Sequence, residues 1–133
     1  MNIKPKKILT EISAGELLDK ISILEIKLEK IKDKESQKEI NKEYTALKET
    51  QKLNIDITEK LQKLFNELKD VNLNLWKIED QIRTSERSKD FGKSFISFAR
   101  NVYFSNDKRS KIKFEINKVL GSNIKEIKKY ESY

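Results

Sequence analysis

The sequence predicts an all-α protein: an antiparallel bundle of three to four long helices, with a short extended N-terminal arm and a basic C-terminal tail. Only one proline and three glycines interrupt 133 residues, which leaves few positions for turns. Apolar residues recur every three or four positions, as in helices that pack on other helices. No alternating strand pattern occurs beyond the first ten positions. At this length we expect a single domain over residues 1–133.

The first helix is expected at about residues 13–33. Ser13 is a favourable N-cap, and Glu16 three residues later completes the pattern of a capping box. Pro5, upstream, belongs to the extended arm. The apolar residues of this helix step by four and three, so they form one packing stripe made of Leu17, Ile21, Leu24, Leu28 and Ile31.

The middle of the chain predicts two helices, at about residues 36–52 and 57–86. The apolar pattern weakens near residue 52 and resumes regularly from Ile57, and Asp56 followed by Glu59 can cap a new helix. We therefore expect a kink or break at residues 52–57. The alternative is one helix over residues 36–86, which would be about 75 Å long and far longer than its neighbours.

The last long helix is expected at about residues 93–120. The polar segment Thr84–Gly92 predicts the turn that precedes it, and Gly121 is placed to end it as a left-handed cap. The basic tail IKEIKKYESY follows. A second apolar side of this helix needs a cover, which is either another copy in a homodimer or the tail folded back: Ile96, Tyr103 and Phe114.

Composition narrows the function classes. The chain has no cysteine and no histidine, which excludes disulfides, thiol nucleophiles, the commonest transition-metal ligand and the commonest general base. We expect no cofactor and no metal. No apolar run approaches the length of a bilayer span, and the first residues lack the apolar centre of a signal peptide. We therefore expect a cytoplasmic protein that does not contact membranes.

The net charge of +7 comes from the two ends of the chain. Residues 1–10 carry three lysines and no acid, and residues 108–133 carry eight cations against three carboxylates. The excess positive charge is almost all lysine, whereas proteins that recognise nucleic-acid bases and phosphates usually rely on arginine. Nucleic-acid binding is therefore an alternative that ranks behind the two readings given below. All four arginines lie between positions 83 and 109.

Polar side chains lie on the apolar face of the last helix. A rotation of 100° per residue places them in the middle of the apolar stripe that runs from Phe95 to Leu120, where a plain bundle would have leucine or isoleucine: Asn106, Arg109, Lys113 and Asn117. Burying an unpaired charge costs several kcal/mol, so such residues normally face partners, water or a ligand. In an antiparallel hairpin, Arg109 and Lys113 lie opposite Leu68 and Phe65, where they can meet acidic groups from another helix.

The preceding helices supply candidate partners for these residues. Asn72, Trp76, Glu79 and Arg83 follow spacings of four, three and four, and Glu25 interrupts the apolar face of the first helix. We predict an interhelical pocket for a small anionic metabolite. Its cations Arg83, Arg109 and Lys113 would hold the anion, Asn72 and Asn106 would orient it, and Trp76 would form a wall. Glu79 and Glu25 are the catalytic acid/base candidates.

Two other interpretations remain open. A buried network of Glu, Arg and Asn can instead fix helix pairing, in which case the protein is a homo-oligomeric interaction or adaptor protein without catalytic activity. The spacing of Glu16 and Asp19 can hold Mg²⁺ on one helix face, but Glu16 already has a role in capping.

Four stretches resemble an uncharacterised family of small all-helical bacterial and bacteriophage proteins, a domain of unknown function. They are GELLDKISILEIKLEKI (15–31), LWKIEDQIR (75–83), FISFARNVYFSNDKRSKIKFEIN (95–117) and GSNIKEIKKY (121–130). The likeness is collinear over nearly the whole chain, except about residues 32–60. It implies no activity. It implies characteristic positions at Glu16, Asp19, Lys20, Glu25, Trp76, Glu79, Asp80, Arg83, Arg100, Tyr103, Asn106, Asp107, Arg109 and Lys113.

Overall fold

The protein is an all-helical bundle, which confirms the predicted fold class. The computed structural model describes residues 3–133, and it contains no strand over that range. Its four helices are α1 (Ala14–Lys30), α2 (Lys34–Asn54), α3 (Glu59–Arg87) and α4 (Lys93–Leu120). The first two residues of the expected N-terminal arm lie outside the described part. Residues 3–13 form neither helix nor strand, and Ile3, Ile8 and Leu9 are exposed.

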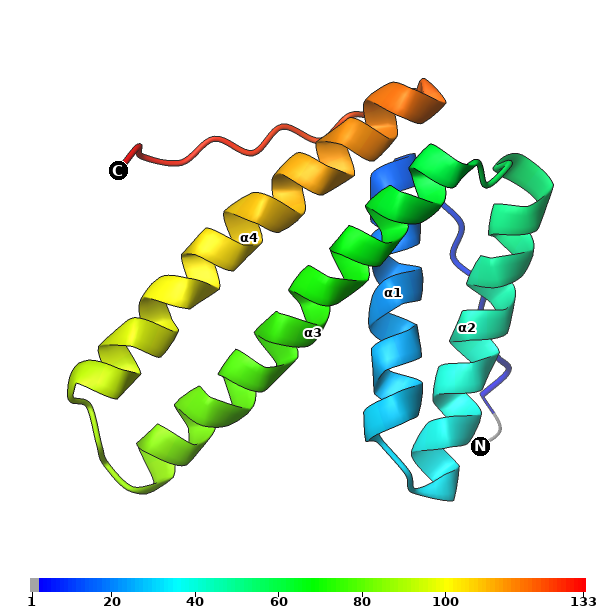
Figure 1. The fold of residues 1–133 in the computed structure, drawn as a ribbon. Helices are drawn as coiled ribbons and strands as arrows, with labels where there is room; N and C mark the ends of the chain where they lie inside the picture. Colours follow the sequence, from blue (N-terminus) through cyan, green and yellow to red (C-terminus); the bar gives the residue numbers. More distant parts are fainter. Residues whose placement is uncertain (1–2) are drawn as a thin grey trace.

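The helices form two antiparallel pairs (Figure 1). α1 and α2 lie side by side, whereas α3 and α4 form a longer hairpin that leans across α1 and diverges from it toward the turn at residues 88–92. α1 contacts each of the other three helices. The half of the hairpin near this turn therefore extends beyond α1 and α2.

Short breaks set the ends of α1, α2 and α3. α1 ends at Lys30 and not near residue 33, because Asp33 is the N-cap of the next helix and accepts a hydrogen bond from Ser36 N at 2.9 Å. Residues 36–86 form two helices and not one. The cap of α3 is Thr58, whose hydroxyl accepts from Leu61 N at 3.2 Å, and not Asp56 as expected.

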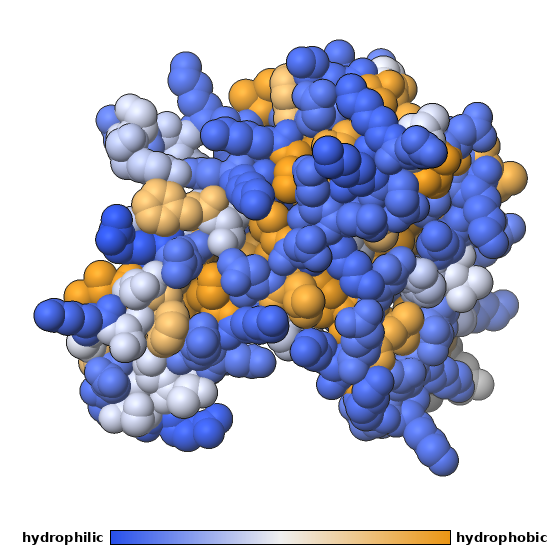
Figure 2. All heavy atoms as spheres, viewed as in Figure 1, coloured by the Kyte–Doolittle hydropathy of each residue, from blue (hydrophilic) through white to orange (hydrophobic). Residues whose placement is uncertain are grey.

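The core lies where α1 packs on the first half of α3 and the second half of α4. α2 adds partly buried side chains, but Gln51 is its one buried residue. Figure 2 shows a mainly hydrophilic surface on the viewed face, with apolar residues visible between the charged side chains. The buried cluster consists of Leu17, Leu18, Ile21, Leu61, Leu68, Val71, Ile112 and Ile116.

The C-terminal tail folds back along α4 (Figure 1). Gly121 ends α4 in the left-handed conformation expected of it, with φ of 60°. The ring of Tyr133 lies 5.7 Å from that of Tyr103 and 5.3 Å from that of Phe104, and Lys128 pairs with Asp107 at 3.1 Å. Of the two covers considered for this side of α4, the structure therefore contains the tail.

Two apolar side chains stay exposed beyond the reach of α1 and the tail. Phe91 is 51% exposed at the turn of the hairpin, and Ile96 is 55% exposed on the first turn of α4. Over residues 3–133, no helix has both the length and the apolarity needed to cross a membrane.

Candidate functional site

Asp19 is the centre of a buried polar cluster between three helices. Its side chain is fully buried, on the face of α1 that contacts α3 and α4. Arg109 Nε donates to Asp19 Oδ1 at 3.0 Å and Arg109 Nη2 donates to Oδ2, which makes a two-pronged pair. Asn72 Nδ2 donates to Asp19 Oδ1 and to Ser22 Oγ, both at 2.8 Å. The buried carboxylate is thus fully partnered.

The hydrogen bonds to Asp19 raise the pKa of Arg109 above its usual value, although burial opposes this. Lys113 adds a second cation one turn along α4. Its Nζ lies 2.6 Å from Glu16 Oε2, 3.6 Å from Glu126 Oε2 and 3.8 Å from Asp19 Oδ2. Arg109 and Lys113 therefore meet acidic groups of another helix, as the antiparallel register predicts.

Both carboxylates of the Glu16 and Asp19 pair form ion pairs with cations of α4. Within residues 3–133, no three Asp, Glu, His or Cys side chains are grouped closely enough to hold a metal ion. The spacing that suggested Mg²⁺ instead places two acids on the side of α1 that faces α4.

The first turn of α1 is also held by α4 and the tail. Ala14 N donates to Ser122 Oγ at 3.1 Å, Gly15 N to Asn117 Oδ1 at 2.7 Å and Glu16 N to Ser13 Oγ at 3.0 Å. A Cβ on Gly15 would lie 2.5 Å from the backbone oxygen of Lys113, so glycine is required by this close approach. The protein itself supplies the hydrogen-bond acceptors for these N–H groups, so the first turn of α1 serves to attach α1 to α4 and the tail.

A cleft opens beside the cluster, where α1 diverges from the hairpin. Its volume is about 340 Å³. Its lining combines four polar residues of α3 and α4 with apolar residues of α1 and α3. It brings together five of the eight predicted site residues: Asn72, Trp76, Glu79, Asn106 and Arg109, together with Ile23, Ile26 and Leu75.

The other three predicted residues lie elsewhere. Arg83 hydrogen-bonds Glu79 one turn along α3, but its largely exposed side chain does not line the cleft. Lys113 is displaced toward the tail, as described above. Glu25 lies on the far side of α1, where its carboxylate accepts from Tyr44 Oη at 3.0 Å and from Lys69 Nζ at 3.1 Å.

The Glu25 group is a local ion-pair network. Burial and the hydrogen bond to Glu25 raise the pKa of Tyr44. The pKa of Lys69 is lowered by burial but raised overall by its hydrogen bonds to Glu29 and Glu25. Glu25 thus ties α1 to α2 and α3, and it does not share the cleft with Glu79.

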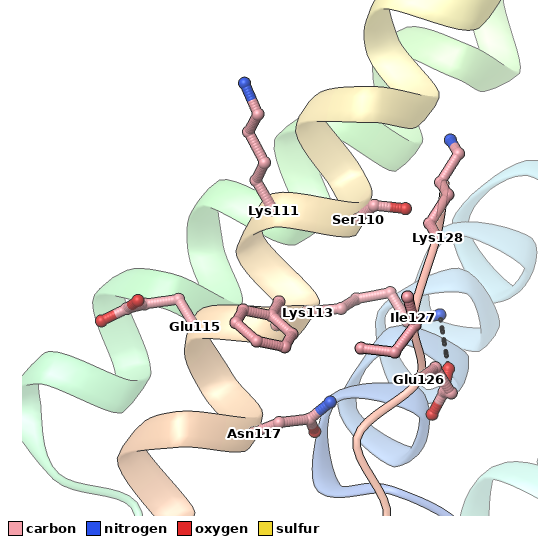
Figure 3. A pocket seen from close by; sticks show the side chains of 9 residues that line it. Ser110, Lys111, Lys113, Glu115, Asn117, Glu126, Ile127 and Lys128 are labelled. Carbon is pink, nitrogen blue, oxygen red and sulfur yellow. Dashed lines mark ion pairs between the residues drawn. The ribbon is translucent and has the colours of Figure 1, made fainter. Parts of the chain in front are cut away.

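A second and larger cavity, of about 590 Å³, lies between α4 and the tail (Figure 3). Lys113 lines the cavity and reaches toward Glu126, and Lys111 points away from this ion pair. Of the eight predicted site residues, Lys113 alone lines this larger cavity, and this lysine is already paired with Glu16. We therefore take the smaller cleft as the candidate site.

Sequence reasoning missed two kinds of contributor. The spacing pattern offers Asp19 as a metal ligand and does not assign it to the site, although the inward cations of α4 require a carboxylate on a facing helix. Ile23 and Ile26 lie off the main stripe of α1, which indicates that a second side of the helix is covered, but this position does not by itself assign them to the site.

Comparison with known proteins gives one match. Residues 8–133 match the model described as a family of unknown function, DUF6165. No curated protein and no solved structure matches the chain.

Proposed function

The chain belongs to the DUF6165 family of unknown function, and from the cleft we propose that the protein binds a small anionic metabolite between α1, α3 and α4. The observation that carries the proposal is the convergence of Asn72, Trp76, Glu79, Asn106 and Arg109 on one cavity. Ligand sites are typically concave, mostly apolar and equipped with a few polar groups that fix orientation.

Arg109 is the residue that would hold the anion. Its hydrogen bonds to Asp19 use Nε and one proton of Nη2, so the Nη1 group and the outer edge of the guanidinium are not involved in that pair. The pair also fixes the side chain, which lowers the entropy cost of binding a carboxylate or phosphate. Asp19 is therefore a positioning residue in this proposal.

The remaining residues would orient and enclose the ligand. Asn106 offers an amide to the cleft, and the side-chain nitrogen of Asn72 is engaged by Asp19 and Ser22, which leaves its carbonyl oxygen. Trp76 supplies an apolar wall. Glu79 is the acid/base candidate, because Glu25 lies on the other side of α1. Arg83 would act through Glu79, and Lys113 through the carboxylates of α1.

The test is a thermal-shift screen of small carboxylates and phosphorylated metabolites. A ligand that binds only the folded state raises the melting temperature in proportion to RT ln(1 + [L]/Kd). Asn106→Ala should abolish the shift given by a hit while leaving the unliganded melting temperature close to that of the wild type. Asn101→Ala is the matched control, because Asn101 is exposed on the same helix and does not line the cleft. Equal shifts in both variants would place the ligand elsewhere.

One observation favours a second function, that of a homo-oligomeric interaction protein. Phe91 and Ile96 are exposed on the part of the hairpin that α1 does not cover, and isolated helical hairpins commonly pair into four-helix bundles. Light scattering coupled to size-exclusion chromatography tests this. A dimer that dissociates in Ile96→Ser would support it, and a monomer at all concentrations would rule it out.

A further inference from the structure

The cleft is electrically balanced. Glu79 and Arg109 are the two charged residues that line it. The charge of Arg109 is matched by Asp19 and that of Glu79 by Arg83, so the four groups sum to zero. A ligand carrying only negative charge would bring an uncompensated charge close to Asp19 and Glu79, which is costly in a partly desolvated site.

The polar groups of the cleft therefore divide into two subsites. Arg109 and Asn106, both from α4, offer N–H donors that suit a carboxylate. Trp76 and Glu79, less than one turn apart on α3, combine an aromatic ring with a carboxylate, a pair that suits an ammonium group. One subsite thus comes from each helix of the hairpin.

The size and the walls restrict the ligand further. A cavity of about 340 Å³ is at the small end of the range of ligand sites, which runs from roughly 300 to 1,000 Å³. Ile23, Ile26 and Leu75 supply aliphatic surface, which suits a ligand that carries an apolar group about as large as these side chains.

We propose that the ligand of the cleft is an α-amino acid with an apolar side chain, bound as the zwitterion. Its carboxylate pairs with Arg109 and Asn106, its ammonium group with Glu79 and the ring of Trp76, and its side chain with the isoleucines of α1. This inference rests on the proposed function: it keeps the site and the carboxylate held by Arg109, and it replaces a ligand of net negative charge by one whose ammonium group balances that carboxylate.

The experiment compares matched ligands by isothermal titration of the full chain. Leucine, methionine and phenylalanine are each paired with the α-hydroxy acid of the same skeleton, which keeps the carboxylate but replaces the ammonium group by a hydroxyl. A charge-assisted hydrogen bond contributes about 1.5–3 kcal/mol, so at least one amino acid should bind roughly 10- to 100-fold more tightly than its hydroxy acid.

Glu79→Gln should remove this discrimination, because the affinity for the amino acid should fall to that for the hydroxy acid. Asp80→Asn makes the same change at the neighbouring exposed position, outside the cleft, and should leave it intact. Hydroxy acids that bind as tightly as the amino acids, or a screen in which only other anions bind, would overturn the inference and leave the proposed function standing. If no amino acid, no hydroxy acid and no anion of the screen binds, both this inference and the proposed function fail.

Discussion

At the scale of single residues, Asp19 decides how α1 joins the hairpin. A carboxylate with no exposed surface is tolerated because Arg109 and Asn72 satisfy it. The helical period predicted that Arg109 and Lys113 point inward, because it reports the direction of a side chain. It could not predict the partner, since the direction does not say which residue of a neighbouring helix lies opposite.

Removing Arg109 should cost much more stability than removing a surface arginine. Arg109→Leu leaves the Asp19 charge buried without its main partner, so the free energy of unfolding should fall by about 3–5 kcal/mol. Arg83→Leu breaks the exposed pair with Glu79 and should cost at most about 1 kcal/mol. Urea denaturation of both variants gives the comparison, and equal losses would mean that the Asp19 pair contributes little.

Gly15 should not tolerate even one methyl group. Alanine normally favours a helix over glycine by about 1 kcal/mol. Here its Cβ would lie 2.5 Å from Lys113 O and 2.9 Å from Asn117 Oδ1, so we expect Gly15→Ala to destabilise the fold by about 1–3 kcal/mol. Thermal denaturation measures the change, with exposed Ser97→Ala as the control. A stabilised Gly15→Ala variant would show that α1 can move away from α4.

At the scale of elements, the sequence predicted the existence of each helix better than its ends. The break between α2 and α3 falls at residues 55–58, close to the expected position. Asp56 and Thr58 are both residues that favour an N-cap, and the choice depends on which one lets α3 start with its apolar stripe against α1. That choice is made by tertiary packing and is not encoded in the local pattern.

α2 should be the least protected helix. It packs on α1, and Gln51 is its one buried residue, so few apolar contacts oppose its local opening. Hydrogen exchange followed by mass spectrometry should show faster exchange in residues 36–50 than in residues 18–26 of α1. Similar protection in the two segments would mean that α2 opens only with the whole fold.

The tail should detach from α4 in acid. Hydrogen bonds from Tyr133 and Lys128 hold the pKa of Asp107 below its ordinary value of 3.8. A lowered pKa in the docked state stabilises docking above that ordinary value, and the contribution is lost as the pH falls through the lowered pKa. Amide resonances of residues 125–133, followed by NMR from pH 6 downward, should therefore move toward random-coil positions below about pH 4.

Asp107→Asn is the control for this transition, because it cannot carry the charge that Lys128 and Tyr133 recognise. Its tail should be loosened already at pH 6, with little further change in acid. A tail that stays docked in this variant would assign docking to the aromatic contacts of Tyr133 alone.

At the scale of the whole molecule, the cleft follows from unequal helix lengths. α1 has 17 residues and the helices of the hairpin have 29 and 28, which corresponds to about 26 Å against about 43 Å. α1 can cover only part of the hairpin, and the cleft forms where that cover ends. The sequence predicted the lengths and most of the inward residues. It could not predict which of these residues share one cleft, and Glu25, Arg83 and Lys113 do not line it.

The fluorescence of Trp76 tests the central claim most directly, because the chain has a single tryptophan and that residue lines the cleft. Titration with an apolar α-amino acid should give a saturable change in emission. The change should persist in Asn101→Ala and disappear in Asn106→Ala. Emission that shows no saturable response to any amino acid, carboxylate or phosphate, or a response that Asn106→Ala leaves intact, would contradict the existence of a ligand site between α1, α3 and α4.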